Sequence, residues 1–310
     1  MGIIRGGDTE YEENKPTVEE LSARVEEAIA VALEAAPTTL KLSGRYYSKD
    51  EVTLLARSPQ VNSVRNLDLS DNQIDDSALQ VLIESEKLEY LEELNLGLNF
   101  LTDEGVKAWA VSENAVLKNL KTLVLSDNKL TDESLADLVQ SPNFPMLESL
   151  DVGWMGAGNG TARALGGSNA MIRLKQLTLE RSYIDGVGIR ALVQGKIIER
   201  LEELNLTANK LGDEGAKILA GTSNLKNLRV LHLSQNMIGD EGAVAIGTST
   251  GLSGLTHLYL GRNNFGSEGA KAVHETQTLA HLKTLILQEG VETTPDLVNY
   301  SRPELLRPDQ

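Results

Sequence analysis

The sequence contains no cysteine, few aromatic residues and no long apolar run. The lack of cysteine excludes disulfide bonds, thiolate metal sites and mechanisms that use a cysteine nucleophile. No stretch approaches the roughly 18 apolar residues of a membrane-spanning helix, and the first residues lack the apolar core of a signal peptide. We therefore expect no membrane partner, and a location in the cytoplasm or export without a classical signal peptide.

Basic residues are scarce relative to acidic ones. The 310 residues include 29 Lys and Arg against 45 Asp and Glu, which gives a formal net charge of −16. Such a surface repels the phosphate backbone of nucleic acids over most of its area, so no nucleic-acid partner is expected. The remaining composition, 41% hydrophobic and 24% charged, is that of an ordinary folded protein.

A repeated segment accounts for most of the chain. Segments such as "LEELNLTANKLGDEGAKILA" (201–220) follow the pattern L-x-x-L-x-L-x-x-N-x-Φ, where Φ is apolar, and continue into a turn and a helical run. The units begin 27 residues apart, except for one interval of 29, and a weaker unit with Leu40 and Leu42 precedes them. The nine regular units begin at Val64, Leu91, Leu120, Leu147, Leu174, Leu201, Leu228, Leu255 and Leu282.

This pattern resembles the leucine-rich-repeat family over about residues 37–290. The repeat length and the "GDEGAKILA" helix are similar to the ribonuclease-inhibitor-like class, which includes the bacterial GALA-type repeats. The resemblance implies an α/β fold. It would be a right-handed solenoid, or horseshoe, with a parallel β-sheet on the concave face and helices on the convex face.

The residues support the same fold on physical grounds. Alternating leucines give a short strand with one buried face, and only stacking of the units can bury that face. The asparagine after the strand, as at Asn209, can bond the backbone of a neighbouring unit, so stacked units would share a ladder. Asp103, Asp213 and Asp240 stand where helix N-caps are expected, and a following glutamate suits the helix dipole. Most acidic pairs are therefore interpreted as structural.

The two ends differ from the repeats. Thr17 and Glu20 form the signature of a capping box, which predicts a helix over residues 17–35. This helix either closes the first strand or detaches to bind a partner, and residues 1–15 are expected to be mobile. Its apolar stripe consists of Leu21, Val25, Ile29 and Leu33. The expected division is residues 1–36 as N-terminus and capping helix, 37–290 as a solenoid of nine to ten units, and 291–310 as C-terminal cap and tail.

Partner-binding residues are expected on the inner face, where the strand residues other than leucine point. Small residues dominate one of its columns, so bulky exceptions indicate contact positions, and Trp, Tyr and Arg are common in binding hot spots. Trp154 is either a contact residue or packed on neighbouring strands, whereas Trp109 is predicted to lie in the core. The candidate partner-binding residues are Leu98, Phe100, Trp154, Arg181, Tyr183, His232, Tyr259 and Arg262.

The later part of this face is less acidic than the whole molecule. An acidic or phosphate-bearing partner segment could dock there, or the cations could instead be solvated and paired with Glu180 and Glu202. The cations concerned are Arg181, Arg229, His232 and Arg262.

The stretch "DVGWMGAGNG" (151–160) resembles a phosphate-binding loop only superficially. It lacks the G-x-G-x-x-G spacing and a following Walker lysine, and it keeps the phase of the repeat, so no nucleotide cofactor is expected. Met155 and Ser182 replace the ladder asparagine in two adjacent units, which could alter curvature or open a notch beside Trp154. His232 and His257 could be diagonal neighbours, but no further metal ligand is evident. We expect no catalytic, cofactor or metal site.

The leading hypothesis is a non-catalytic scaffold that binds a partner protein on the concave face. Ran GTPase-activating proteins resemble the "N-x-I-G-x-E-G-A" run at residues 236–243, so a GTPase regulator is an alternative, although the long acidic tail of that family is missing. A host-directed bacterial effector is another, but the sequence shows neither an F-box nor a catalytic cysteine.

Overall fold

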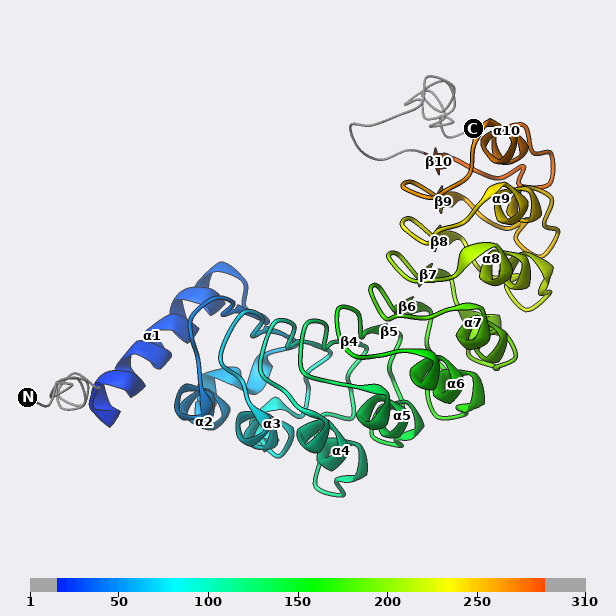
Figure 1. Cartoon of the computed structure of the whole chain (residues 1–310). Coiled ribbons are helices and arrows are strands. Elements are labelled where there is room, and N and C mark those ends of the chain that lie inside the picture. Colours follow the sequence, from blue (N-terminus) through cyan, green and yellow to red (C-terminus); the bar gives the residue numbers. More distant parts are fainter. Residues whose placement is uncertain (1–15, 288–310) are drawn as a thin grey trace, which may run out of the picture.

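Ten parallel strands form one sheet along the inner side of a continuous arc, and helices cover the outer side (Figure 1). The computed structural model describes residues 16–287, so the expected mobile segment 1–15 and the expected cap and tail 291–310 lie outside the described residues. The predicted α/β solenoid is confirmed. No helix within residues 16–287 combines the length and apolarity needed to cross a membrane.

Strands and helices alternate strictly from β1 to β10, with three short 3-10 helices in the connections. The strands are β1 (Thr39–Lys41), β2 (Asn66–Asp68), β3 (Glu93–Asn95), β4 (Thr122–Val124), β5 (Ser149–Asp151), β6 (Gln176–Thr178), β7 (Glu203–Asn205), β8 (Val230–His232), β9 (His257–Tyr259) and β10 (Thr284–Ile286). The α-helices are α1 (Val18–Ala35), α2 (Lys49–Arg57), α3 (Asp76–Ile83), α4 (Asp103–Val111), α5 (Asp132–Gln140), α6 (Asn159–Gly167), α7 (Gly186–Leu192), α8 (Gly212–Gly221), α9 (Asp240–Gly247) and α10 (Ser267–His274). The 3-10 helices are η1 (Pro59–Ser63), η2 (Glu86–Leu88) and η3 (Ile198–Arg200).

The register of the sheet aligns equivalent positions of successive repeats. Leu150 of β5 pairs with Leu177 of β6, which pairs with Leu204 of β7, and these leucines are buried. Each sequence position therefore forms a column that runs across the strands about 4.8 Å apart. The sheet also continues without interruption through the two units that lack the ladder asparagine.

Asparagine side chains connect the turns of neighbouring repeats. Asn99 donates from Nδ2 to the carbonyl oxygens of Leu69 in the preceding repeat (3.0 Å) and Leu96 in its own (3.1 Å), and its Oδ1 accepts from the backbone N–H of Ile74 (3.0 Å). Each amide thus satisfies backbone groups that the turn would otherwise bury unpaired. The predicted ladder is confirmed at Asn72, Asn99, Asn128, Asn209, Asn236 and Asn263.

Aspartates at the helix starts form a second ladder. Asp132, the first residue of α5, accepts hydrogen bonds from the N–H groups of Gly158 (2.7 Å), Gly160 (3.1 Å) and Thr161 (2.8 Å), and from Thr161 Oγ1 (2.7 Å). A carboxylate from the preceding repeat therefore occupies the place at the start of α6 where an anion would bind. This explains the glycine at position 160, because a Cβ there would collide with the Asp132 carboxylate.

The interpretation of these aspartates as N-caps of their own helices is wrong. The N-cap of α4 is Thr102, whose Oγ1 accepts from the N–H of Glu104, and Asp103 is the first helical residue. The carboxylate of Asp103 instead accepts from Thr131 N (2.8 Å) and Thr131 Oγ1 (2.7 Å) in the next repeat. The structural role expected for the acidic pairs is confirmed in this different form for Asp76, Asp103, Asp132, Asp213 and Asp240.

Helix α1 packs at the N-terminal end of the sheet (Figure 1). The predicted capping box is present, since Thr17 N donates to Glu20 Oε2 (2.8 Å) and Glu20 N donates to Thr17 Oγ1 (3.2 Å). Val25 and Ile29 of the predicted stripe are buried and join the hydrophobic core. The core position of Trp109 is also confirmed, because it is fully buried and packs edge-on against Phe144.

Replacement of Asp132 by alanine should destabilise the chain. It would leave the N–H groups at the start of α6 without their acceptor, so we expect a loss of about 2–4 kcal/mol in the free energy of unfolding at pH 7. Denaturant unfolding of the full chain measures this loss. Glu133→Ala is the matched control. Glu133 is exposed and ion-paired with Lys107, so its loss should cost less than about 1 kcal/mol.

The difference between wild type and Asp132→Ala should also depend on pH. Burial alone would raise the pKa of Asp132, but the hydrogen bonds from Thr161, Gly158 and Gly160 outweigh it and lower the pKa below its ordinary value of 3.8. The stabilisation is therefore present above pH 3.8 and is lost as the pH falls through the lower pKa of the folded state. A difference that widened on acidification would contradict this assignment.

Candidate protein-interaction surface

The residue immediately before the ladder position adopts the left-handed backbone conformation in every turn from β1 to β9. Tyr46, Tyr183 and Met237, directly after the ladder position, adopt it as well. The N–H of the residue before the ladder position continues the sheet hydrogen bonding, as from Trp154 N to Glu180 O (2.7 Å). The φ of this residue lies between 50° and 58° in the non-glycine cases, a region that costs an L-residue about 1–2 kcal/mol. The residues before the ladder position are Asp71, Leu98, Asp127, Trp154, Arg181, Ala208, Gln235 and Arg262, with Gly44 in the first repeat.

Six of the eight candidate residues lie in these turns and not on the strands. We call this surface the turn edge. It consists of the residues immediately before and after the ladder position of each repeat. The role of these six in partner binding stays a prediction; the structure places them just beyond the ends of the strands. The six are Leu98, Phe100, Trp154, Arg181, Tyr183 and Arg262, whereas His232 and Tyr259 are on β8 and β9.

The turn edge concentrates exposed apolar side chains. Six of the twelve large hydrophobic residues that are exposed within residues 16–287 lie on it, with exposed fractions of 46% to 76%, so it is the main apolar surface of that region. Trp154 is 46% exposed, which excludes burial between strands. The six are Tyr46, Leu98, Phe100, Trp154, Tyr183 and Met237.

Cations from the next repeat lie over the aromatic rings of the turn edge. The Arg181 guanidinium carbon is 3.9 Å from the centre of the Trp154 ring, a close cation–π contact. Lys129 lies over Phe100 at 5.2 Å and Lys210 over Tyr183 at 5.0 Å. The arrangement fixes each ring beside a positive charge, so the turn edge is both apolar and locally basic. Leu98 and Phe100 are two repeats away from Trp154, and the cation–π pair of Phe100 with Lys129 does not include Trp154.

The turn edge carries no side chain at Gly156, next to Trp154. This glycine stands in the column of Phe100 and Tyr183, and its N–H donates to Leu130 O (2.9 Å). A Cβ there would lie 3.0 Å from the same carbonyl oxygen, a tight contact, although Phe100 and Lys129 make the equivalent backbone bond in their repeats at 2.9 Å. The altered curvature and the notch considered for this unit stay predictions.

His232 and Tyr259 form a separate group on the strands. Their rings stack with centres 4.3 Å apart and planes 2° apart, and His232 Nε2 lies 3.6 Å from Glu203 Oε1. His257 is diagonal to His232, as expected, and its Nδ1 lies 2.8 Å from Thr256 Oγ1. No group of three potential metal ligands occurs within residues 16–287.

One carboxyl group on the concave face has an altered pKa. Burial raises the pKa of Asp151, and the nearby charge of Glu180 adds to the rise, against hydrogen bonds from Gly153 N and Ser126. Asp151 stands at the end of β5, between the turn edge and the strands.

Comparison with known proteins identifies the repeat. Six segments match the family model described as Leucine Rich repeat, and no curated protein is significantly similar in sequence. The matched segments are 62–82, 87–108, 116–139, 201–220, 224–247 and 254–273.

The six matched units are leucine-rich repeats. The two repeats without a ladder asparagine, which begin at Leu147 and Leu174, fall between the matched segments. The turns that hold Trp154, Arg181 and Tyr183 therefore belong to a stretch of the solenoid that the family model does not match.

Three solved structures are matched at low sequence identity. The plant peptide hormone receptor RGFR1 in complex with RGF2 is 20% identical with a TM-score of 0.42, over 81% of this chain and 36% of the receptor chain. An internalin (inlF) from Listeria monocytogenes is 19% identical with a TM-score of 0.36, over 89% of this chain and 95% of the internalin chain. The structure of the Rad7 and Elc1 complex in yeast is matched at 17% identity and a TM-score of 0.46, over 85% of this chain and 76% of the matched chain. This chain spans only about a third of the receptor's length.

Sequence reasoning missed part of the turn edge. Lys129, Lys210 and Met237 occupy the position directly after the ladder residue, and the sequence-based predictions did not include this column. Tyr46, Phe100 and Tyr183 occupy the same position in other repeats, so the column contains several large side chains. The missing signal was therefore present in the sequence.

Trp154 should dominate the quenching of tryptophan fluorescence. The chain has two tryptophans, of which Trp109 is fully buried and Trp154 is exposed, so Trp154→Phe should remove most acrylamide quenching. Arg181→Gln should increase quenching of the remaining wild-type Trp154, because it removes the guanidinium that covers the ring. Both variants should change the free energy of unfolding by less than about 1 kcal/mol. Unchanged quenching in Trp154→Phe would contradict the exposure of this ring.

Proposed function

We propose that this leucine-rich-repeat protein is a non-catalytic scaffold that binds a partner protein at the rim of its concave face. The observation that carries the proposal is that exposed aromatic and apolar side chains lie on the turn edge of five repeats, with Trp154 and Tyr183 on two adjacent central ones. Contiguous exposed apolar groups commonly mark protein-interaction sites, and Trp, Tyr and Arg contribute strongly to binding energy in such sites.

The backbone of the turn edge supports a role for these side chains beyond folding. Trp154 has φ 58°, a conformation that glycine adopts without strain and that Gly44 adopts in the first repeat. A bulky residue at this position costs stability, and its ring is not buried in the core in return. Binding of a partner accounts for a strained and exposed tryptophan better than packing does.

The proposed contact area extends from the turns onto the later strands. Leu98 and Phe100 lie at its N-terminal end, and Trp154, Arg181 and Tyr183 form its centre. The stacked pair His232 and Tyr259, with Arg262 in the next turn, would form its C-terminal end. Three strand spacings of about 4.8 Å separate the Phe100 repeat from the Tyr183 repeat, so an extended segment of four or five residues could span the centre.

We further assign the repeats to the ribonuclease-inhibitor-like class. The support is a complete α-helix of seven to ten residues in every repeat from α2 to α10, rather than a short turn. A full helix on the outer side is wider than the strand on the inner side, and this difference in width produces the arc seen in Figure 1.

Trp154→Gly should abolish most partner binding without destabilising the fold. Glycine fits the left-handed backbone, so the free energy of unfolding should change by less than about 1 kcal/mol, whereas loss of a central aromatic contact should weaken binding at least about tenfold. Affinity capture from the native cell extract with wild type and variant, followed by titration of the captured protein, measures the effect.

Gln235→Gly is the matched control for this experiment. It makes the same change in the same left-handed turn position, three repeats further along, where no large apolar side chain is lost. Equal binding by wild type and Trp154→Gly would contradict the proposed surface. If the captured protein is a GTPase whose GTP hydrolysis the chain stimulates, the scaffold assignment is replaced by that of a GTPase regulator.

A further inference from the structure

A row of alternating charges runs along the opposite end of the strands. Its members stand immediately before each strand, and we call this surface the strand-start edge. Neighbouring members have opposite charges and can pair across strands, as Lys175 Nζ does with Glu148 Oε2 at 2.8 Å. From the residue before β5 to the residue before β10, the members of the row are Glu148, Lys175, Glu202, Arg229, Thr256 and Lys283.

The alternation ends at Thr256, where an acid would be expected between Arg229 and Lys283. Thr256 Oγ1 donates to the carbonyl oxygen of Arg229 (3.0 Å) and contributes no charge. Arg229 donates from Nη1 to the carbonyl oxygens of Lys226 (3.2 Å), Leu228 (3.1 Å) and Gly254 (3.2 Å). These neutral groups hold the guanidinium in place without cancelling its charge, so the edge becomes positive from this point.

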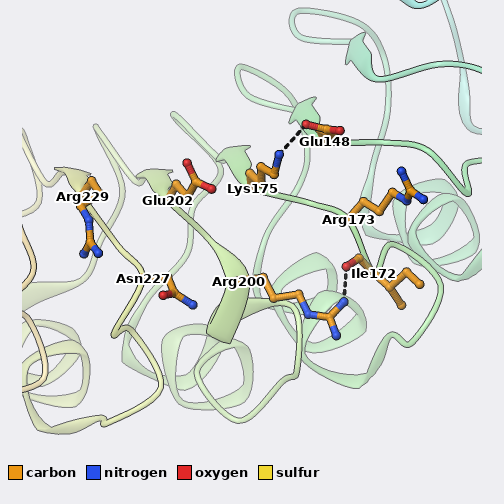
Figure 2. Close-up of a pocket in the computed structure, with 8 residues that line it drawn as sticks. All are labelled: Glu148, Ile172, Arg173, Lys175, Arg200, Glu202, Asn227 and Arg229. Carbon is orange, nitrogen blue, oxygen red and sulfur yellow. Dashed lines mark hydrogen bonds and ion pairs between the residues drawn. The ribbon is translucent and has the colours of Figure 1, made fainter.

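Two adjoining hollows share Arg229 on this edge. The first has a volume of about 540 Å³, and Figure 2 shows its lining in two rows, with Lys175, Glu202 and Arg229 immediately before successive strands. Arg200 is oriented there by a hydrogen bond to Ile172 O. The second hollow, of about 530 Å³, includes Lys283 and, among residues 16–287, no carboxylate. Within the same residues, six Lys and Arg side chains and two glutamates line the two hollows, in a chain of net charge −16.

We infer that these hollows form a second binding site, which takes an acidic peptide segment of a protein partner. Guanidinium groups bind carboxylates through paired hydrogen bonds, and Arg173 and Arg200 stand beside Lys175 for this purpose. A long polyanion such as a nucleic acid would meet the acidic remainder of the surface, whereas a short acidic segment engages only the hollows. This site is separate from the turn edge and does not depend on it.

The spacing of the cations specifies the segment further. Lys175 and Arg229 lie two strands apart, roughly 10 Å along the sheet, and an extended peptide rises about 3.3 Å per residue. Carboxylates three residues apart therefore match these two cations, with the first carboxylate sharing Lys175 with its exposed partner Glu148. Arg229 and Lys283 are again two strands apart, so a third carboxylate at the same interval would continue the match.

The test uses labelled 12-residue peptides that carry three glutamates in a Gly/Ser background, spaced at two, three or four residues. Fluorescence anisotropy with the full chain should show the tightest binding at a spacing of three. Arg173→Gln together with Arg229→Gln should weaken this binding about tenfold. Arg173→Gln alone, at an exposed side chain, should weaken it about threefold and keeps the test valid if Arg229→Gln lowers stability.

Lys217→Gln with Lys271→Gln is the matched control, because it removes the same charge from the exposed surfaces of α8 and α10. This control should bind the acidic peptide as tightly as wild type does. Trp154→Gly should also bind the peptide normally, because that substitution changes only the turn edge. The inference is overturned by any of three results: no peptide binding by wild type, equal weakening by the control, or tighter binding of a 12-nucleotide oligo(dT) than of the best peptide.

Discussion

The hydrogen bonds between successive repeats are the interactions on which the whole molecule depends. A single leucine-rich repeat cannot bury its apolar face alone, and stacking two of them would also bury backbone groups of the turns and helix starts. Asn99 supplies partners to the turn of the preceding repeat, and Asp132 supplies them to the helix start of the following one. Both bridges fix the relative position of neighbouring repeats, and the columns of the sheet follow from that register.

The two ladders also explain how the chain tolerates the irregular stretch at residues 151–160. Met155 is buried, with 7% of its surface exposed, and its thioether cannot make the hydrogen bonds of an asparagine amide. At the same junction Asp132 accepts four hydrogen bonds from the next helix start. At the following junction Asn159 Nδ2 donates to Asp185 Oδ1 (2.9 Å) and its Oδ1 accepts from Asp185 N (3.2 Å). The aspartate ladder thus compensates for the gap in the asparagine ladder.

The fold could be predicted from the sequence because the same pattern recurs in each repeat, so a substitution at one position does not obscure the pattern as a whole. The site could be predicted only in part. The bridging role of Asp103 depends on contact with a residue 28 positions away, which local capping rules do not describe. The left-handed turn was hidden because Leu98, Trp154 and Arg181 are residue types that disfavour it, so their presence gave no conformational signal. Arg229 was grouped with Arg181, although the register places them at opposite ends of the strands.

In this protein, a residue that differs in type from the equivalent residues of the other repeats carries more functional information than the shared residue types do. The stability of a solenoid is a sum of terms within repeats and between neighbours, so an exposed position can change without disturbing distant repeats. Trp154 is the one aromatic residue at its turn position, and Thr256 departs from the alternation of charges on the strand-start edge. The first adds an apolar surface at one end of the strands, and the second leaves a positive one at the other. Because the rigid sheet holds both edges at a fixed separation, a single partner with an apolar segment and an acidic one could be bound in one orientation only.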